Sequence, residues 1–288
     1  PINRFSWRQS LLRGGVQGLL AALLLLGLLA LARRTVRNPE DVKRFSAMRC
    51  LGQLPQVTQK KRSKGPAGPI TLQSNAADPL YAEAVRTAVT RLQHRRERNG
   101  ERSYMVTSTL PGEGKTTTAA NLALALAQDG SRVILVDADL RLQSLHEFFR
   151  LDGNSRGLPE LLAADQPADP LTLLTPVPGT TLRLLCSGQR VHAPYSLLQP
   201  QKIAAILERL RSHADYLLID TPPAGALSDA SYFFRCVDGV IYVIRSDYAE
   251  QHQITDSLQA IADARAGTCG YILNGVSPAA LRHSYGKY

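Results

Sequence analysis

The stretch Thr107-Ser-Thr-Leu-Pro-Gly-Glu-Gly-Lys-Thr-Thr-Thr118 decides the fold. A candidate strand, residues 103–108, leads into it, and an alanine- and leucine-rich helical pattern, residues 115–128, follows it. Glycines at close approach let backbone N–H groups point at a phosphate, and the positive end of the following helix adds its dipole. A strand, a Gly-x-Gly-Lys-Thr-Thr loop and a helix in this order are typical of a P-loop. Residues 107–118 are therefore expected to bind the phosphates of ATP.

The residue types in this loop suggest individual roles. Lys115 is expected to reach the β- and γ-phosphates, and the Thr116 hydroxyl to ligate Mg²⁺. The strict form of the motif begins with glycine, whereas Thr109 takes that place here. The candidate nucleotide contacts in the loop are Pro111, Gly112, Glu113, Gly114, Lys115, Thr116 and Thr117.

Two further apolar runs end in aspartate. Residues 216–220 end in Asp220 and have the Walker B arrangement, which anchors Mg²⁺ directly or through water. Residues 133–137 continue as Asp137-Ala-Asp139-Leu-Arg141. Both strand ends are expected at the carboxyl edge of a parallel sheet, where ligands bind. Asp137 and Asp139 would share a face of an extended strand, and the alternative for Asp139 is a turn or helix cap.

Short apolar runs alternate with amphipathic helical patterns along the rest of the chain. Apolar strands separated by helices predict an α/β fold of the P-loop NTPase type, with a mostly parallel, twisted sheet covered by helices on both faces. The candidate strands are residues 103–108, 132–137, 182–185, 216–220, 239–244 and 270–274, and the candidate helices are residues 79–98, 115–128, 200–212 and 249–266.

The net charge of +10 is unevenly distributed. Residues 1–64 hold 13 Lys+Arg and 2 Asp+Glu, a balance of +11, whereas residues 65–288 hold 21 and 22, a balance of −1. A basic cluster confined to one end, beside an apolar segment, suits an anionic membrane surface better than nucleic acid. We therefore expect no nucleic-acid partner.

Residues 14–32 are apolar apart from Gln17 and are just long enough to cross a hydrocarbon core of about 30 Å as a helix. A secretory signal peptide is the alternative, because Ala30-Leu-Ala32 resembles a cleavage site. A domain that uses ATP would lack its nucleotide outside the cytoplasm, which favours one transmembrane anchor in the inner membrane. The chain begins with Pro1, so we expect it to be part of a longer protein.

The chain is expected to divide into four parts. Residues 1–34 form the membrane anchor, and residues 35–78 a basic juxtamembrane segment and linker, in which Asn38 caps a short helix. Residues 79–276 form the ATP-binding domain on the cytoplasmic side, and residues 277–288 form a tail. The four cysteines are far apart and have no metal-binding spacing, so we expect thiols in a reducing compartment.

The motifs in residues 112–116, 137–141 and 219–223 together resemble those of the bacterial tyrosine kinases (BY-kinases) of capsule and exopolysaccharide synthesis. The resemblance covers most of the chain. Residues 35–42 and 51–55 look like the stretch after the second membrane helix of polysaccharide chain-length regulators. Cys186-Ser-Gly188 and residues 194–198 look like the family's loop before the Walker B strand.

The resemblance implies an ATP- and Mg²⁺-dependent protein-tyrosine kinase that phosphorylates itself and regulates polysaccharide synthesis and export. It implies a homo-oligomer that works with the polymerisation and export machinery. The implied catalytic residues are Lys115, Asp137, Asp139 and Asp220; the metal ligands are Thr116, Asp137 and Asp220; the nucleotide contacts beyond the loop are Arg141 and, at the adenine, Asn274.

The sequence departs from the family's pattern at two places. Glu83 and Arg86 match the oligomer-forming pattern, but Val89 stands where a second arginine belongs. The family's tail is rich in tyrosines that are autophosphorylated, whereas here the tail contains Tyr285 and Tyr288 alone. These two tyrosines are the candidate autophosphorylation sites, and we expect them to be phosphorylated in trans.

Two other functions fit the same motifs. Switch ATPases of the partition and division-site group share the fold, but they place a second lysine five residues before the invariant one, where this chain has Leu110. A regulator that binds ATP without transferring phosphate is the other alternative.

Overall fold

The computed structural model describes residues 7–32, 34–57, 71–72, 78–151, 156–164, 166, 168–188, 191, 193–226 and 228–285, without the side chains of residues 7–10, 26, 28–32 and 282–285. The chain forms two compact units, residues 1–35 and residues 36–288.

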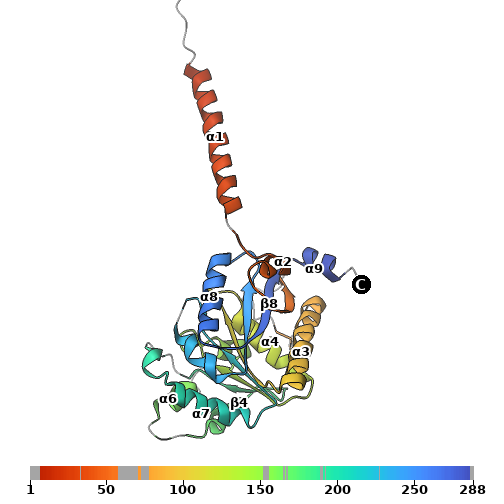
Figure 1. Ribbon diagram of the computed structural model, residues 1–288, viewed down its shortest axis with the longest axis vertical. Helices are drawn as coiled ribbons and strands as arrows, with labels where there is room; N and C mark the ends of the chain where they lie inside the picture. The colour runs from red at the N-terminus through yellow and green to blue at the C-terminus, as the bar shows by residue number, and fades with distance from the viewer. Residues whose placement is uncertain are drawn as a thin grey trace, which may run out of the picture. The chain divides into compact units, whose positions relative to one another are not determined.

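The first unit contains helix α1 (Trp7–Ala32), drawn in red in Figure 1. Within the described residues, no helix combines the length and the apolar character that a bilayer crossing requires. The expected transmembrane segment over residues 14–32 is therefore not supported.

The second unit is built on one sheet with the strand order β1-β8-β7-β2-β6-β3-β5-β4. The strands pair in parallel except β4, which runs antiparallel to β5 at one edge. Their bounds are β1 (Cys50–Pro55), β2 (Ser103–Ser108), β3 (Val133–Asp137), β4 (Leu174–Pro176), β5 (Arg183–Leu185), β6 (Tyr216–Asp220), β7 (Gly239–Arg245) and β8 (Thr268–Val276).

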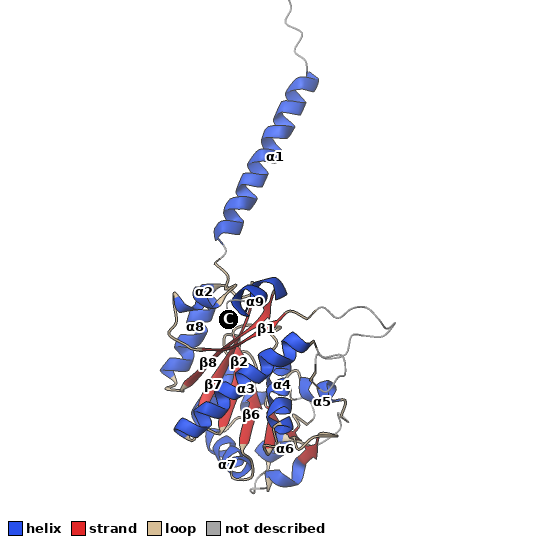
Figure 2. Cartoon of the chain, turned by 90° about the vertical axis from the view of Figure 1, so that its right-hand side faces the viewer, coloured by secondary structure: helices blue, strands red, loops and turns tan. Residues whose placement is uncertain are grey.

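Helices cover both faces of this sheet (Figure 2). Successive residues of a strand point to opposite faces, so Tyr104 and Val106 pack with α3 and α4 on one face, while Met105 packs on the other. The helices are α2 (Pro39–Lys43), α3 (Pro79–Asn99), α4 (Lys115–Gln128), α5 (Ser144–Phe149), α6 (Leu158–Ala163), α7 (Pro200–Arg211), α8 (Gln251–Asp263) and α9 (Pro278–Tyr285), with 3₁₀ turns η1 (Pro170–Leu173), η2 (Pro194–Ser196) and η3 (Ser228–Cys236).

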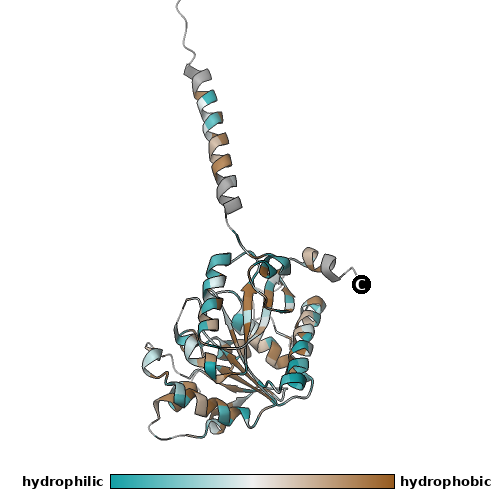
Figure 3. Cartoon of the chain, viewed as in Figure 1, coloured by the Kyte–Doolittle hydropathy of each residue, from teal (hydrophilic) through white to brown (hydrophobic). Residues whose placement is uncertain are grey.

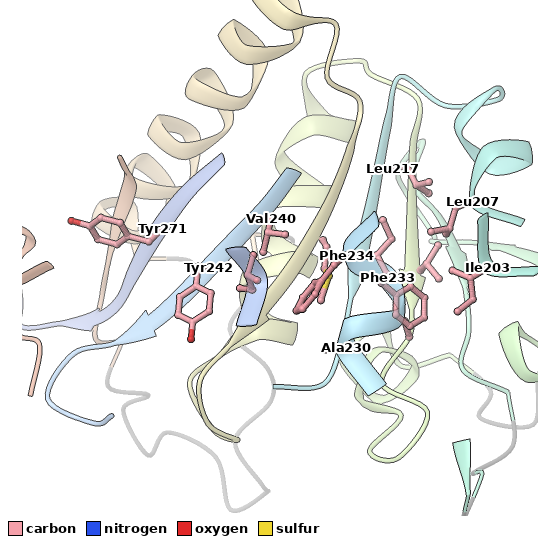
Figure 4. Close-up of a cluster of buried hydrophobic side chains, with 14 of the residues drawn as sticks. Ile203, Leu207, Leu217, Ala230, Phe233, Phe234, Val240, Tyr242 and Tyr271 are labelled. Atoms are coloured by element: carbon pink, nitrogen blue, oxygen red, sulfur yellow. The ribbon is translucent and has the colours of Figure 1, made fainter. Parts of the chain in front are cut away.

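The two apolar layers between sheet and helices form the core. On one face, side chains of α7 and η3, among them Leu207 and Phe233, pack against strand residues such as Leu217 and Val240 (Figure 4). In Figure 3 the strands are mostly brown, and teal residues gather on the outer sides of the helices. The parallel α/β fold expected from the sequence is confirmed.

The second unit begins earlier than the expected boundary at residue 79. Asn38 caps α2 as expected, since its side chain accepts a hydrogen bond from the Asp41 amide. Residues 50–55, expected to belong to the basic juxtamembrane segment and linker, form edge strand β1, which pairs with β8. Close packing fixes this strand, because a Cβ on Gly52 would lie 3.2 Å from the Ala88 Cβ.

A short helix occupies most of the segment that was expected to be a tail. Residues 278–285 form α9, in which Leu281 is buried. The Ala280 amide donates to the Ser277 hydroxyl, and Pro278 stands at the first helical position, a combination that favours a helix start.

Candidate nucleotide-binding site

The loop between β2 and α4 lies at the carboxyl edge of the central strands. Strand β2 ends at Ser108 between β6 and β7, and α4 begins at Lys115. Gly112 and Gly114 have φ angles of +83° and +91°, which favour glycine. A Cβ at position 114 would also collide with the Asn274 side-chain amide.

Thr109 occupies the position where the strict P-loop pattern has glycine. Its hydroxyl lies 2.8 Å from the Tyr242 hydroxyl of β7, and both side chains are buried. The residue that must be glycine here is Gly225, which packs against the Thr109 backbone: a Cβ on Gly225 would lie 2.6 Å from the Thr109 carbonyl oxygen. The Thr109 side chain therefore points toward the sheet, so it does not disturb the backbone path of the loop.

The two strand-terminal aspartates lie side by side. Asp137 and Asp220 are direct partners in the register of β3 and β6, and both are fully buried. One carboxylate oxygen of Asp137, Oδ2, accepts hydrogen bonds from the Ser187 hydroxyl at 2.9 Å and from the Leu145 amide at 3.3 Å. Sequence reasoning assigned no role to Ser187, although it lies in the quoted Cys186-Ser-Gly188 segment.

The electrostatics of this pair are set by burial. Desolvation, and secondly the neighbouring charge of Asp220, hold the pKa of Asp137 well above its usual range. Burial likewise raises the pKa of Asp220 to about 6, against the opposing effects of the Lys115 ammonium and the nearby Thr116 hydroxyl. Neither carboxylate oxygen of Asp220 has a hydrogen-bond partner among the described residues. The nearby Thr116 hydroxyl therefore does not form a well-aligned hydrogen bond with Asp220.

Several buried polar atoms around the loop have no hydrogen-bond partner among the described residues. They are Asp137 Oδ1, both carboxylate oxygens of Asp220, and Thr118 Oγ1. Unpartnered buried oxygens are costly, and carboxylates with raised pKa values favour a nearby cation. The donor set consists of hard oxygen atoms beside a phosphate loop, which fits Mg²⁺ bound by one or two carboxylates together with nucleotide phosphates.

Asp139 and Arg141 are bonded within the protein. Asp139 Oδ1 accepts the Arg141 and Leu142 amides at 3.4 and 3.2 Å, which is the turn-capping role considered as the alternative for this residue. The Arg141 guanidinium donates to Asp229 of η3 at 2.7 Å. Asp229 is another residue that sequence reasoning missed, because no motif marks it.

Side chains from β7, β8 and the turn after β7 contact the loop backbone. Asn274 donates to the Glu113 carbonyl at 2.8 Å, so its described contact is with the loop itself. The Glu113 carboxylate is buried and accepts the Leu110 and Arg245 amides at 2.6 and 3.2 Å. Burial raises the pKa of Glu113, and these amides oppose that shift.

The candidate phosphorylation sites lie at the end of the chain. Tyr285 is the last residue of α9; its backbone is described, but its side chain is not. Tyr288 lies outside the described residues.

The site therefore combines a glycine loop at a helix N-terminus, a lysine and a threonine at its base, and two buried carboxylates at the sheet edge. This combination defines a P-loop nucleotide-binding protein. The family model described as the CobQ/CobB/MinD/ParA nucleotide binding domain matches residues 104–280.

Comparison with known proteins narrows the class. YwqD of Bacillus subtilis, a tyrosine-protein kinase, is 34% identical over 210 residues, which cover 73% of this chain and 86% of YwqD. EpsB of Ralstonia nicotianae is 29% identical over 262 residues, 88% of this chain. The kinase domain of the Escherichia coli tyrosine kinase ETK superposes with a TM-score of 0.75 and 28% identity, covering 84% of this chain and 96% of that domain.

The chain belongs to the CobQ/CobB/MinD/ParA nucleotide-binding family and, within it, to the BY-kinases. It spans 34% of the length of EpsB.

Proposed function

We propose that this chain carries an ATP- and Mg²⁺-dependent protein-tyrosine kinase domain that regulates capsular or exopolysaccharide synthesis and export. The observation that carries the proposal is the adjacent pair Asp137 and Asp220, with unpartnered oxygens, at the base of the loop that contains Lys115 and Thr116. The family relationship to tyrosine kinases supports the choice of tyrosine as acceptor.

In the proposed reaction, the oxygen of a tyrosine hydroxyl attacks the γ-phosphorus, the bond to the β–γ bridging oxygen breaks, and ADP leaves. Lys115 and the loop amides offset the charge that develops on the phosphoryl oxygens. Thr116, Asp137 and Asp220 would hold Mg²⁺, which supplies further charge neutralisation when bound. Because the unperturbed pKa of tyrosine is about 10, an aspartate, Asp137 or Asp139, orients the hydroxyl and accepts its proton.

The experiment is incubation of the purified chain with γ-labelled ATP and Mg²⁺, followed by phosphoamino-acid analysis. We expect label on tyrosine that requires Mg²⁺ and is lost in Asp220→Asn. Exposed Asp256→Asn serves as the control and should keep the activity. Label absent from tyrosine in the unaltered protein would refute the proposal.

We also propose that the domain works at the cytoplasmic face of the inner membrane. Support comes from the basic excess in residues 1–64 and from exposed apolar side chains on α1, including Leu12, Leu20 and Leu24. Removing residues 1–34 should release the domain from vesicles that contain anionic lipid without reducing its affinity for Mg-ADP. Equal vesicle binding by both forms would contradict this attachment.

Self-association is proposed through the exposed side of α3. Glu83 and Arg86 are exposed there, whereas Val89, at the position of the expected second arginine, is buried in the core. An arginine would not fit that position without unpacking the helix. We therefore propose an oligomer that uses Glu83 and Arg86 alone, and Arg86→Glu should shift the protein toward the monomer in sedimentation analysis.

A further inference from the structure

Side chains from one side of the site fix the backbone of the candidate phosphate loop. They donate hydrogen bonds to three successive carbonyl groups of the loop. The contacts are the Tyr248 hydroxyl to the Pro111 carbonyl at 2.9 Å, Arg245 Nη1 to the Gly112 carbonyl at 3.0 Å, and Asn274 Nδ2 to the Glu113 carbonyl at 2.8 Å. Three consecutive peptide planes are thus held from the side of β7 and β8.

A planar trans peptide transmits this constraint to the next amide. In a trans peptide the C=O and N–H bonds point in opposite directions, and the described chain contains no cis peptide bond. A carbonyl turned toward Tyr248, Arg245 or Asn274 therefore turns the following N–H group away from them. The N–H groups concerned are those of Gly112, Glu113 and Gly114.

These three donors are available to a ligand. Over the described residues, no acceptor within the chain pairs with the N–H groups of Gly112, Glu113 or Gly114. An array of successive free N–H groups beside a helix N-terminus is a strong anion-binding arrangement. Its geometry is present without a ligand because the carbonyls are already bonded.

Tyr248 and Arg245 act together in this arrangement. The Arg245 guanidinium lies 4.9 Å from the centroid of the Tyr248 ring, so each side chain limits the movement of the other. A Cβ on Gly112 would lie 3.2 Å from the Tyr248 hydroxyl, which places the ring directly against the loop. Tyr248 is 43% exposed, so its hydroxyl has a local role at the rim of the site and little part in the core.

We propose that Tyr248 and Arg245 are positioning residues that preorganise the loop amides for the β-phosphate of the bound nucleotide. The inference rests on the proposed function only in taking this loop as the phosphate site. It extends the site to Arg245, the last residue of strand β7, and to Tyr248 in the turn that follows, both of which lie outside every motif of the sequence.

The test measures nucleotide affinity by calorimetry for Tyr248→Phe, which removes the hydroxyl and keeps the ring. Mg-ADP affinity should fall about two- to ten-fold, the effect of one neutral hydrogen bond. AMP affinity should stay the same, because AMP lacks the phosphate that reaches the loop. Arg245→Met should show the same selective loss, and Arg245→Lys, which keeps a donor, should recover part of it.

The control is Tyr195→Phe, a change at another exposed tyrosine; it should bind both nucleotides as the unaltered protein does. A second readout needs no nucleotide: in Tyr248→Phe the ¹⁵N chemical shifts should change at Gly112 and Glu113. Unchanged Mg-ADP affinity in Tyr248→Phe, or an equal loss for AMP and ADP, would overturn the inference. Both results are independent of kinase activity, so a chain that binds Mg-ADP but phosphorylates no tyrosine would refute the proposed function alone.

Discussion

Among single residues, the site is characterised by charged side chains that are buried, namely Lys115, Asp137 and Asp220. Lys115 is only 5% exposed, and its ammonium lowers the pKa of Asp220 against the effect of burial. We propose that this cation balances a carboxylate before nucleotide binds and balances phosphate afterwards. Substitution of Lys115 should therefore impair phosphate chemistry more than folding.

Lys115→Met should reduce phosphoryl transfer by roughly 10²-fold or more, because it removes the charge that we propose faces the transferred group. Labelled ATP and quantified phosphotyrosine give the measurement. Exposed Lys43→Met is the matched control and should leave the rate unchanged. Near-normal activity in Lys115→Met would show that the loop has been assigned wrongly.

Ser187→Ala should weaken the response to Mg²⁺. The Ser187 hydroxyl is the side-chain donor to Asp137 Oδ2, and its loss leaves the carboxylate less fixed and its charged form less favoured. We expect the Mg²⁺ concentration for half-maximal ADP binding to rise several-fold. Ser196→Ala, at an exposed hydroxyl, is the control, and an unchanged Mg²⁺ requirement in Ser187→Ala would refute this role.

At the scale of elements, local signals predicted the centre of the sheet well. Strands β2 and β6 and helix α4 have the bounds expected from the sequence, because apolar runs and the glycine loop specify them directly. Strands β1 and β4 were missed. Their short, polar or proline-containing segments become strands through pairing with β8 and β5, which a local pattern does not reveal.

The same limit applies to the site. The loop, Asp137 and Asp220 carry motifs, so the sequence alone predicted that they would lie together at one edge of the sheet, where Asp137 and Asp220 are partners in the register. Ser187 lies 50 positions from Asp137, and Asp229 lies 88 positions from Arg141. Only the folded sheet edge brings such residues together, so their contacts could not be predicted from spacing.

One ion-pair junction gives a prediction about pH. Asp215, just before β6, accepts hydrogen bonds from Arg132 and Arg96, so it links β3 to α3. The hydrogen bond from the Arg132 side chain is the main reason that the pKa of Asp215 lies below its usual range. A depressed carboxyl pKa contributes stability above the unfolded value of about 4, and this contribution is lost as the pH falls toward the folded value.

Asp215→Asn should therefore lower the free energy of unfolding by about 1 kcal/mol near pH 7, since Arg132 is largely exposed. The difference from the unaltered protein should shrink as the pH falls below about 4. Urea unfolding at several pH values gives the measurement, with Asp169→Asn in an exposed pair as the comparison. A difference that is constant with pH would contradict this role of the junction.

At the scale of the whole molecule, the question is how a substrate tyrosine reaches the site. We predict phosphorylation of Tyr285 and Tyr288 in trans, with a rate that rises with protein concentration. Each phosphate would add roughly −1.5 to −2 charges and loosen association between subunits. Tyr285 is the last residue of α9, the helix in which Leu281 is buried.

Mixing two variants tests the trans route. Lys115→Met serves as acceptor only, and the active partner lacks both tail tyrosines through Tyr285→Phe and Tyr288→Phe. Label on the tail of the inactive chain is expected. Label confined to other residues would mean that these tyrosines are not the acceptors.

The proposed kinase differs from a switch ATPase in the fate of the γ-phosphoryl group, which passes to a tyrosine and not only to water. The most direct measurement follows γ-labelled ATP in one reaction with Mg²⁺ and quantifies label on protein tyrosine and in free phosphate over time. We predict that phosphotyrosine accumulates and that Lys115→Met abolishes it. Release of free phosphate without any phosphotyrosine would contradict the claim and indicate a switch ATPase.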